Sequence, residues 1–165
     1  MKKILIGLLF ALVSVRVSSI YINYTPAFVG YLFIFLGLGE GWDTPSRSAS
    51  RTIALGAAVI SAVLWAVGLF GYGTICPVEA TLQVVVTYRV LRWCEEQEDW
   101  EWGYRIQRLR LAWYALAGST VAAFVLGLSN PMLWLVWTVA SLLAAGYYIF
   151  TFYRLRRLAP EGFQG

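Results

Sequence analysis

The chain has 165 residues, a formal net charge of +4, 59% hydrophobic residues and only 13% charged residues. Soluble domains usually carry about 25% charged residues, so this composition excludes an ordinary soluble domain and predicts an integral membrane protein. The length allows one helical bundle without a separate soluble domain.

Six apolar runs, separated by polar turns, predict six transmembrane helices in a single all-α domain. Most runs hold about 17 to 22 residues, which suits a hydrocarbon core of about 30 Å at 1.5 Å per residue. The second run holds about 14 residues, so it either crosses as a short or tilted helix or dips into the bilayer without crossing. The predicted spans are residues 4–22, 26–39, 52–72, 77–93, 111–128 and 131–153.

The basic residues sort to one side of the membrane when the N-terminus is placed inside the cell. Loops 40–51 and 94–110, both chain ends and the inner end of the fourth span, with Arg89 and Arg92, then hold all of the 13 Lys and Arg residues except Arg16. Cytoplasmic loops carry such an excess of Lys and Arg, so both termini are predicted to be cytoplasmic. Each outer turn is followed by proline, which suits the first turn of a helix, and the chain therefore reads as three helical hairpins.

The first run also imitates a signal peptide. A basic start, an apolar run over residues 4–15 and small residues at 17–19 correspond to its three regions. Against cleavage, Arg16 would interrupt the cleavage region, and the apolar run resumes at Ile20. The pattern therefore favours a retained first span. Cleavage would leave five spans in the same orientation.

Two charged residues near the outer side predict a polar seam between the first and fourth helices. Arg16 lies within the first span, and Glu79 lies near the start of the fourth at a compatible depth. A charge inside the membrane needs a partner, so we expect an Arg16–Glu79 ion pair inside the bundle. The seam either binds a polar solute or lipid headgroup, or is structural and fixes the register of two helices. Helical spacing extends the seam through Ser19, Asn23, Gln83 and Thr87.

The third span carries small residues at every fourth position. Small residues let helix backbones approach closely in lipid. This stripe predicts either a contact within the bundle or a face for a homodimer. Its members are Ala54, Ala58, Ala62 and Ala66.

The inner side holds two charged groups. An acidic group after the fourth span predicts either a docking site for a basic partner or a solvated helix–turn–helix tip, with an Arg92–Glu96 pair at i,i+4 spacing. A basic group after the sixth span predicts contact with anionic lipids at the cytoplasmic face, worth about 1 kcal/mol per residue. The acidic group is Glu95, Glu96, Glu98 and Asp99, and the basic group is Arg154, Arg156 and Arg157.

The segment over residues 20–38 contains Pro26, Phe28, Gly30-Tyr31 and Gly37-Leu38. It resembles a segment of a family of small bacterial polytopic membrane proteins whose activity is not established. That family often has Asp after the proline, where this chain has Ala27. The resemblance implies a multi-pass protein of the bacterial cytoplasmic membrane and brings no catalytic residue or cofactor.

Three classes of function follow, in order of preference. The first is a non-enzymatic accessory or partner-binding membrane component, with a membrane protein partner or a second copy. The second is a small transporter, or the substrate-binding subunit of one, that uses the Arg16–Glu79 seam. A membrane enzyme ranks last, because the chain has no histidine and Cys76 and Cys94 lie about 27 Å apart along one helix, too far for a disulfide. We expect no metal, no cofactor and no nucleic acid, because the basic residues flank apolar spans.

Overall fold

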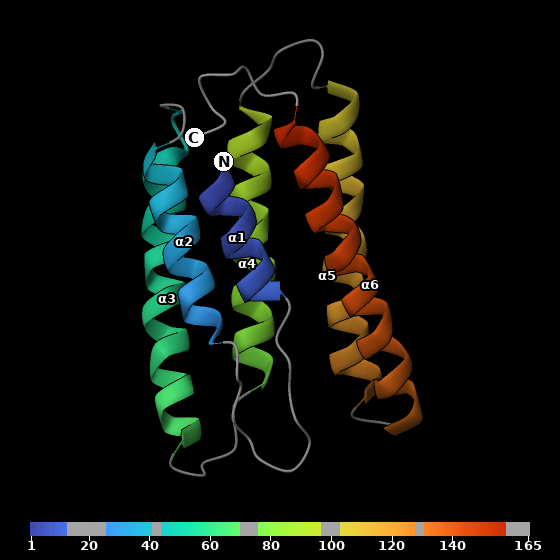
Figure 1. Ribbon diagram of the computed structural model, residues 1–165. Coiled ribbons are helices and arrows are strands. Elements are labelled where there is room, and N and C mark those ends of the chain that lie inside the picture. Colours follow the sequence, from blue (N-terminus) through green and yellow to red (C-terminus); the bar gives the residue numbers. More distant parts are fainter. Residues whose placement is uncertain (13–25, 41–43, 70–75, 97–102, 128–130, 158–165) are drawn as a thin grey trace.

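The computed structural model describes residues 1–12, 26–40, 44–69, 76–96, 103–127 and 131–157 (Figure 1). These residues are all-α, and they form six helices that run along a common axis as an antiparallel bundle. The helices are α1 (Lys2–Leu12), α2 (Ala27–Glu40), α3 (Arg47–Leu69), α4 (Cys76–Glu95), α5 (Gly103–Gly127) and α6 (Pro131–Arg156).

Helix α4 connects the two sides of the bundle. It contacts α1, α3 and α5, whereas α5 packs mainly against α6, and α2 packs against α1 and α3. The indole N–H of Trp113 on α5 donates to the Val84 carbonyl of α4 at 3.2 Å. In Figure 1 the α5–α6 pair therefore stands beside a group formed by α1 to α4.

Helices α1 and α2 approach until their backbones touch. A Cβ atom added at Gly30 would lie 2.5 Å from the Ala11 nitrogen and 2.6 Å from the Gly7 carbonyl oxygen. Gly37 meets Ile4 in the same way. This contact was not predicted from the sequence, in which the small residues of the third span were the predicted packing face. The i+4 spacing of Gly7 and Ala11 was the signal, because small residues at that spacing permit close helix packing in lipid.

Two helices begin earlier than the apolar runs predicted. Helix α3 begins at Arg47 rather than at residue 52, because the Thr44 carbonyl accepts the Arg47 N–H at 3.0 Å and the first helical bond follows at once, from the Ser50 N–H to the Ser46 carbonyl at 2.8 Å. Helix α5 begins at Gly103 rather than at residue 111. The predicted spans 52–72 and 111–128 are apolar stretches, and hydropathy does not mark the polar turns by which these two helices extend beyond them.

Large apolar side chains lie on the surface of the bundle, while several polar side chains lie in its interior. Large apolar side chains are exposed along the helices, among them Met132 at 76% and Leu143 at 71%, while Ser61 and Thr87 are buried. Soluble monomers rarely expose contiguous apolar surface of this kind. Two of the described helices are long and apolar enough to cross a membrane, over residues Arg47–Val67 and Leu135–Arg156, and Ala27–Glu40 is a shorter apolar helix.

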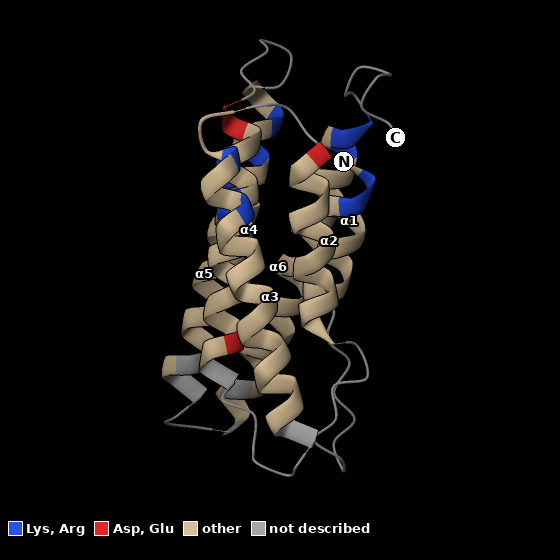
Figure 2. Ribbon diagram, turned by 90° about the vertical axis from the view of Figure 1, so that its left-hand side faces the viewer, with Lys and Arg blue, Asp and Glu red and all other residues tan. Residues whose placement is uncertain are grey.

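Charge gathers at one end of the bundle, called here the basic end. Helices α1, α3 and α5 begin there, and α2, α4 and α6 end there. Figure 2 shows Lys and Arg at this end only, for the part of the chain that is described. Glu79 lies in the first turn of α4, toward the opposite end. The bundle is therefore polarised along its axis.

Candidate functional site

The α4 half of the predicted polar seam faces the inside of the bundle. Glu79 is 8% exposed and Thr87 is 1% exposed. The side-chain amide of Gln83 donates to the Ala11 carbonyl of α1 at 2.8 Å, and the Thr87 hydroxyl donates to the Gln83 carbonyl at 2.7 Å. This polar face of α4 therefore contacts α1, and Gln83 uses its amide to hold the two helices together.

The α1 half of the seam lies outside the described residues. Arg16, Ser19 and Asn23 all fall within residues 13–25, so the Arg16–Glu79 ion pair stays a prediction. Helix α1 is described only to Leu12. Gln83 contacts α1 in the last turn that is described, at Ala11.

Two tyrosines that the sequence analysis missed join the polar interior. Tyr148 of α6 is fully buried, and its hydroxyl donates to the Thr87 carbonyl of α4 at 2.8 Å. Tyr31 of α2 is also fully buried, and its hydroxyl has no hydrogen-bond partner among the described residues. Their position within apolar runs was the available signal, because tyrosines of an aromatic belt lie at the ends of a span.

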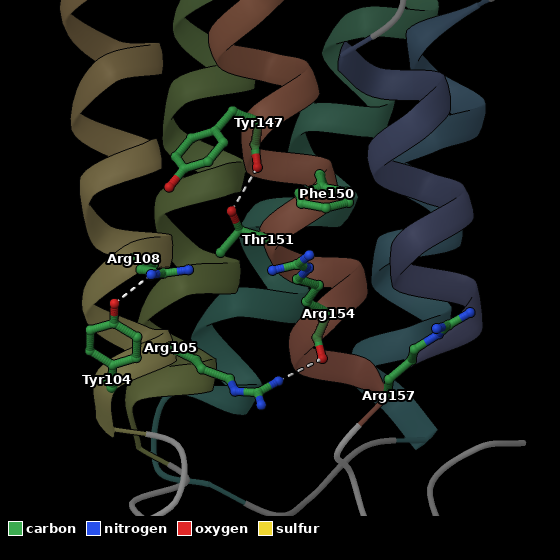
Figure 3. A pocket seen from close by; sticks show the side chains of 8 residues that line it. All are labelled: Tyr104, Arg105, Arg108, Tyr147, Phe150, Thr151, Arg154 and Arg157. Atoms are coloured by element: carbon green, nitrogen blue, oxygen red, sulfur yellow. Dashed lines mark hydrogen bonds between the residues drawn. The ribbon is translucent and has the colours of Figure 1, made fainter.

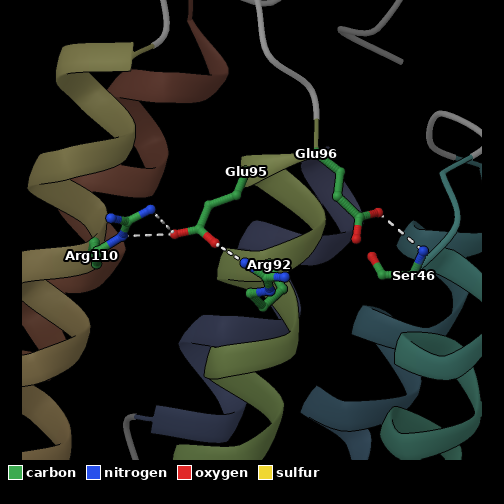
Figure 4. A network of polar contacts seen from close by, with 5 residues as sticks. All are labelled: Ser46, Arg92, Glu95, Glu96 and Arg110. Carbon is green, nitrogen blue, oxygen red and sulfur yellow. Dashed lines mark hydrogen bonds and ion pairs between the residues drawn. The ribbon is translucent and has the colours of Figure 1, made fainter.

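An ionic contact joins α4 to α5 at the basic end (Figure 4). Glu95 pairs with Arg92 of its own helix at 3.0 Å and with Arg110 of α5 at 2.7 Å, and its side chain is only 11% exposed. The predicted Arg92–Glu96 pair is therefore wrong in its partner. Glu95 is the residue that faces α5, where Arg110 supplies a second cation.

Glu96 turns toward α3 instead. Its carboxylate accepts the backbone N–H of Ser46 at 3.0 Å, which joins the end of α4 to the start of α3 (Figure 4). Burial raises the pKa of Glu96. Hydrogen bonds from Ser46 and Thr44 and the charge of Arg92 lower it by more, so the pKa of Glu96 lies below its ordinary value. Glu95 and Glu96 thus both have partners within the chain, and the docking of a basic partner at the acidic group stays a prediction.

The remaining predicted acidic residues, Glu98 and Asp99, lie outside the described residues. Further contacts at the basic end involve α1, α2 and α3. Lys3 of α1 forms an ion pair with Glu40 of α2. Arg47 donates to the Leu38 carbonyl at 2.9 Å and to the Gly39 carbonyl, so an α3 side chain satisfies acceptors at the end of α2.

A cavity of about 440 Å³ opens between α5 and α6 at the basic end (Figure 3). We call it the arginine groove. No described carboxylate pairs with any of its four arginines. The groove is lined by Tyr104, Arg105, Arg108, Tyr147, Phe150, Thr151, Arg154 and Arg157.

Aromatic rings and a backbone carbonyl position these arginines. Arg108 stacks over the Tyr104 ring at 4.6 Å and donates to its hydroxyl, and Arg154 stacks over the Phe150 ring at 4.7 Å. Arg105 donates to the backbone carbonyl of Arg154 at 3.5 Å, across the gap between the helices. These contacts hold Arg105, Arg108 and Arg154 at the groove, whereas Arg157 lies over the Tyr153 ring at 4.9 Å, at the edge of the groove.

The groove holds only part of the predicted lipid-contact group. Arg154 and Arg157 line it, but Arg156 does not. Burial, and then the charge of Arg156, lower the pKa of the Met1 amino group. Sequence reasoning did not assign Arg105 and Arg108 to this site. The signal that both helices share is an arginine pair at i,i+3 spacing, Arg105 with Arg108 and Arg154 with Arg157.

The alanine stripe of α3 is divided between interior and surface. Ala54 and Ala58 are buried in the core of the bundle, whereas Ala62 is half-buried and Ala66 is exposed. The half of the stripe near the basic end is thus a contact within the bundle. The homodimer face remains a prediction that concerns the other half.

The described residues offer little material for catalysis. They contain no group of three or more His, Cys, Asp or Glu side chains that could hold a metal ion. The Cys94 thiol is fully buried, and burial raises its pKa, which disfavours the reactive thiolate. What the site can do chemically is bind: it offers guanidinium groups, aromatic rings and apolar helix surface.

Neither a protein-family model, nor a curated protein, nor a solved structure matches this chain.

Proposed function

We propose that this chain is a six-span integral protein of the bacterial cytoplasmic membrane with both termini inside the cell. Two observations support the proposal: large apolar side chains exposed along the helices, and the gathering of the described basic residues at one end. Helix α4 carries charged residues at both of its ends, among them Glu79 and Arg92, and α5 begins with a charged segment that includes Arg105. Helix α2 is short but packs between α1 and α3.

Within the membrane, the protein acts as a non-enzymatic accessory component that binds rather than converts. The observation that carries this proposal is the arginine groove. Gln83, Glu95 and Glu96 all hold helices together, so their polar groups are used by the fold itself. The arginines of the groove are charged groups that no described carboxylate neutralises, which makes the groove a candidate site for an anion.

Native mass spectrometry of protein released from its own membrane in mild detergent tests this function. We expect a reproducible adduct on the intact chain, and we expect the Arg105→Gln/Arg108→Gln variant to lose it. The conservative Arg105→Lys/Arg108→Lys variant keeps the charge and serves as a check on folding. A bare chain in the wild type, or an adduct that both variants retain in full, would contradict the proposal.

The alternative is a small transporter, or its substrate-binding subunit, that uses the seam around Glu79. The specific observation in its favour is the buried polar group at the interior, where the hydroxyl of Tyr31 has no hydrogen-bond partner among the described residues. This alternative predicts a small polar solute in the same mass spectra. That solute would be lost in Glu79→Gln and retained in the arginine variants, which separates the two functions.

A further inference from the structure

We infer that the arginine groove is a specific site for an anionic phospholipid, and that a headgroup with two phosphates, such as diphosphatidylglycerol, fits it best. The inference rests on the proposed membrane function and deepens it by naming the class of ligand. Four guanidinium groups lie around one cavity between two helices. Basic pockets between membrane helices on the cytoplasmic side are suited to such headgroups.

Several other described arginines at the basic end have polar partners in the chain. Arg92 and Arg110 share the carboxylate of Glu95. Arg47 donates to carbonyls at the end of α2. The positive charge of the groove is therefore left for a ligand, while the positive charge elsewhere on the basic end is partly used.

The arginines are held in positions that suit phosphate oxygens. Figure 3 shows Arg105 of α5 and Arg154 of α6 at the space between the helices, with Arg108 beside Tyr104 and Arg157 extending away from the α5 side chains. Arg108 and Arg154 lie over the rings of Tyr104 and Phe150, and neither guanidinium group pairs with a described carboxylate. Guanidinium groups bind phosphate through bidentate hydrogen bonds.

The count of charges favours two phosphates. One singly charged headgroup would leave a net charge of about +3 among four arginines, whereas a doubly charged headgroup halves the positive charge. The groove contributes no acidic side chain, since its other members are Tyr104, Tyr147, Phe150 and Thr151. The Thr151 hydroxyl already donates a hydrogen bond to the Tyr147 carbonyl at 2.8 Å.

The surface that continues from the groove suits acyl chains. Leu111 follows Tyr104 by two turns on α5, and Leu143 precedes Tyr147 by one turn on α6, so each continues the face that lines the groove. Leu111 is 63% exposed and Leu143 is 71% exposed. A lipid with its phosphates among the arginines would lay its chains along this apolar surface. A free phosphate ion would gain nothing from it.

A lipid titration in detergent micelles, read by native mass spectrometry, tests the site. The probes are tetraoleoyl diphosphatidylglycerol, dioleoyl phosphatidylglycerol and dioleoyl phosphatidylcholine. The groove variant is Arg108→Gln/Arg154→Gln, and Arg108→Lys/Arg154→Lys keeps its charge. The matched control is Lys2→Gln/Arg89→Gln, which removes the same charge from the basic end outside the groove.

We expect the wild type to bind the two-phosphate lipid more tightly than the one-phosphate lipid, with phosphatidylcholine weakest. Charge-assisted hydrogen bonds suggest a loss of about tenfold per arginine, or about 100-fold in the groove variant. The lysine variant should lose less, and the control should stay within about threefold of the wild type. An equal loss in groove variant and control would overturn the inference, since only general surface charge would then matter.

Sodium phosphate provides the arm that separates a lipid from a free anion. Millimolar phosphate should leave the bound lipid in place, and displacement by it would overturn the lipid assignment. Because the titration is done in micelles, it does not depend on which way the protein faces in the cell. If the folded wild-type protein in detergent binds the three lipids equally, this inference is refuted while the proposed function stands. If the protein stays folded and soluble without detergent, the proposed membrane function is refuted.

Discussion

The contact between α1 and α2 gives a prediction whose size follows from the structure. In Gly30→Ala, the new methyl group would lie 2.5 Å from the Ala11 nitrogen, whereas an ordinary contact begins at 3.4 Å. The atoms in the way are backbone atoms, which cannot turn aside as a side chain would. Helix α1 must therefore move away by about 1 Å, and overpacking of this kind costs about 1 to 3 kcal/mol.

Gly118→Ala is the matched control, because a Cβ atom there would meet nothing within 4 Å. Both substitutions replace a helical glycine, so both gain about 1 kcal/mol of helix propensity, and the difference between them isolates the packing. The assay is reversible unfolding of the detergent-solubilised protein by sodium dodecyl sulfate, followed by tryptophan fluorescence. We expect Gly30→Ala to be less stable than Gly118→Ala by about 1 to 3 kcal/mol. Equal stability would refute the backbone contact.

Three further predictions concern the basic end. Glu95→Ala should lower the free energy of unfolding by about 1 to 3 kcal/mol, because it leaves Arg92 and Arg110 without their shared carboxylate. Glu40→Ala removes an exposed ion pair and should lower it by under about 1 kcal/mol, and equal losses in the two variants would contradict this prediction. Because the pKa of Glu96 is lowered in the folded chain, its contribution should be present above its unfolded pKa of about 4.3 and be lost as the pH falls through the folded pKa. Glu96→Gln should remove that part of the acid dependence, and an unchanged stability curve would contradict it. Cys94 should react slowly with maleimide at pH 7 and quickly after denaturation, as mass shifts would show, because burial raises the pKa of its thiol; fast labelling of the folded protein would contradict its burial.

The apolar runs and the one-sided arginines could be predicted because each is a property of local sequence. The positions of the six helices follow from them, whereas the early start of α3 at Arg47 depends on a Thr-Pro-Ser turn that hydropathy does not register. Partner choice at the basic end was less accessible. Whether Arg92 pairs with Glu95 or Glu96 depends on which of them faces Arg110 on the next helix.

The candidate sites differ in the same way. The face of α4 that holds Gln83 follows from helical spacing, but the hydrogen bond from Tyr148 to that helix requires the packing of α6. The arginine groove requires two helices to lie side by side with their arginine pairs at one level. The place of Arg105 in the groove could therefore not be predicted from the sequence. Spacing within a helix is readable from sequence, and the choice of neighbouring helix is not.

The most direct test of the account is the topology of the chain in intact cells. Single cysteines are placed in a Cys76→Ser/Cys94→Ser background, at Ser129 in the predicted outer turn and at Ser48 and Gln107, which are exposed at the basic end. A membrane-impermeant maleimide is then added before and after permeabilisation. We predict that Ser129→Cys is labelled from outside and that Ser48→Cys and Gln107→Cys are labelled only in permeabilised cells. Labelling of Ser48→Cys or Gln107→Cys in intact cells would contradict the proposed six-span arrangement with cytoplasmic termini.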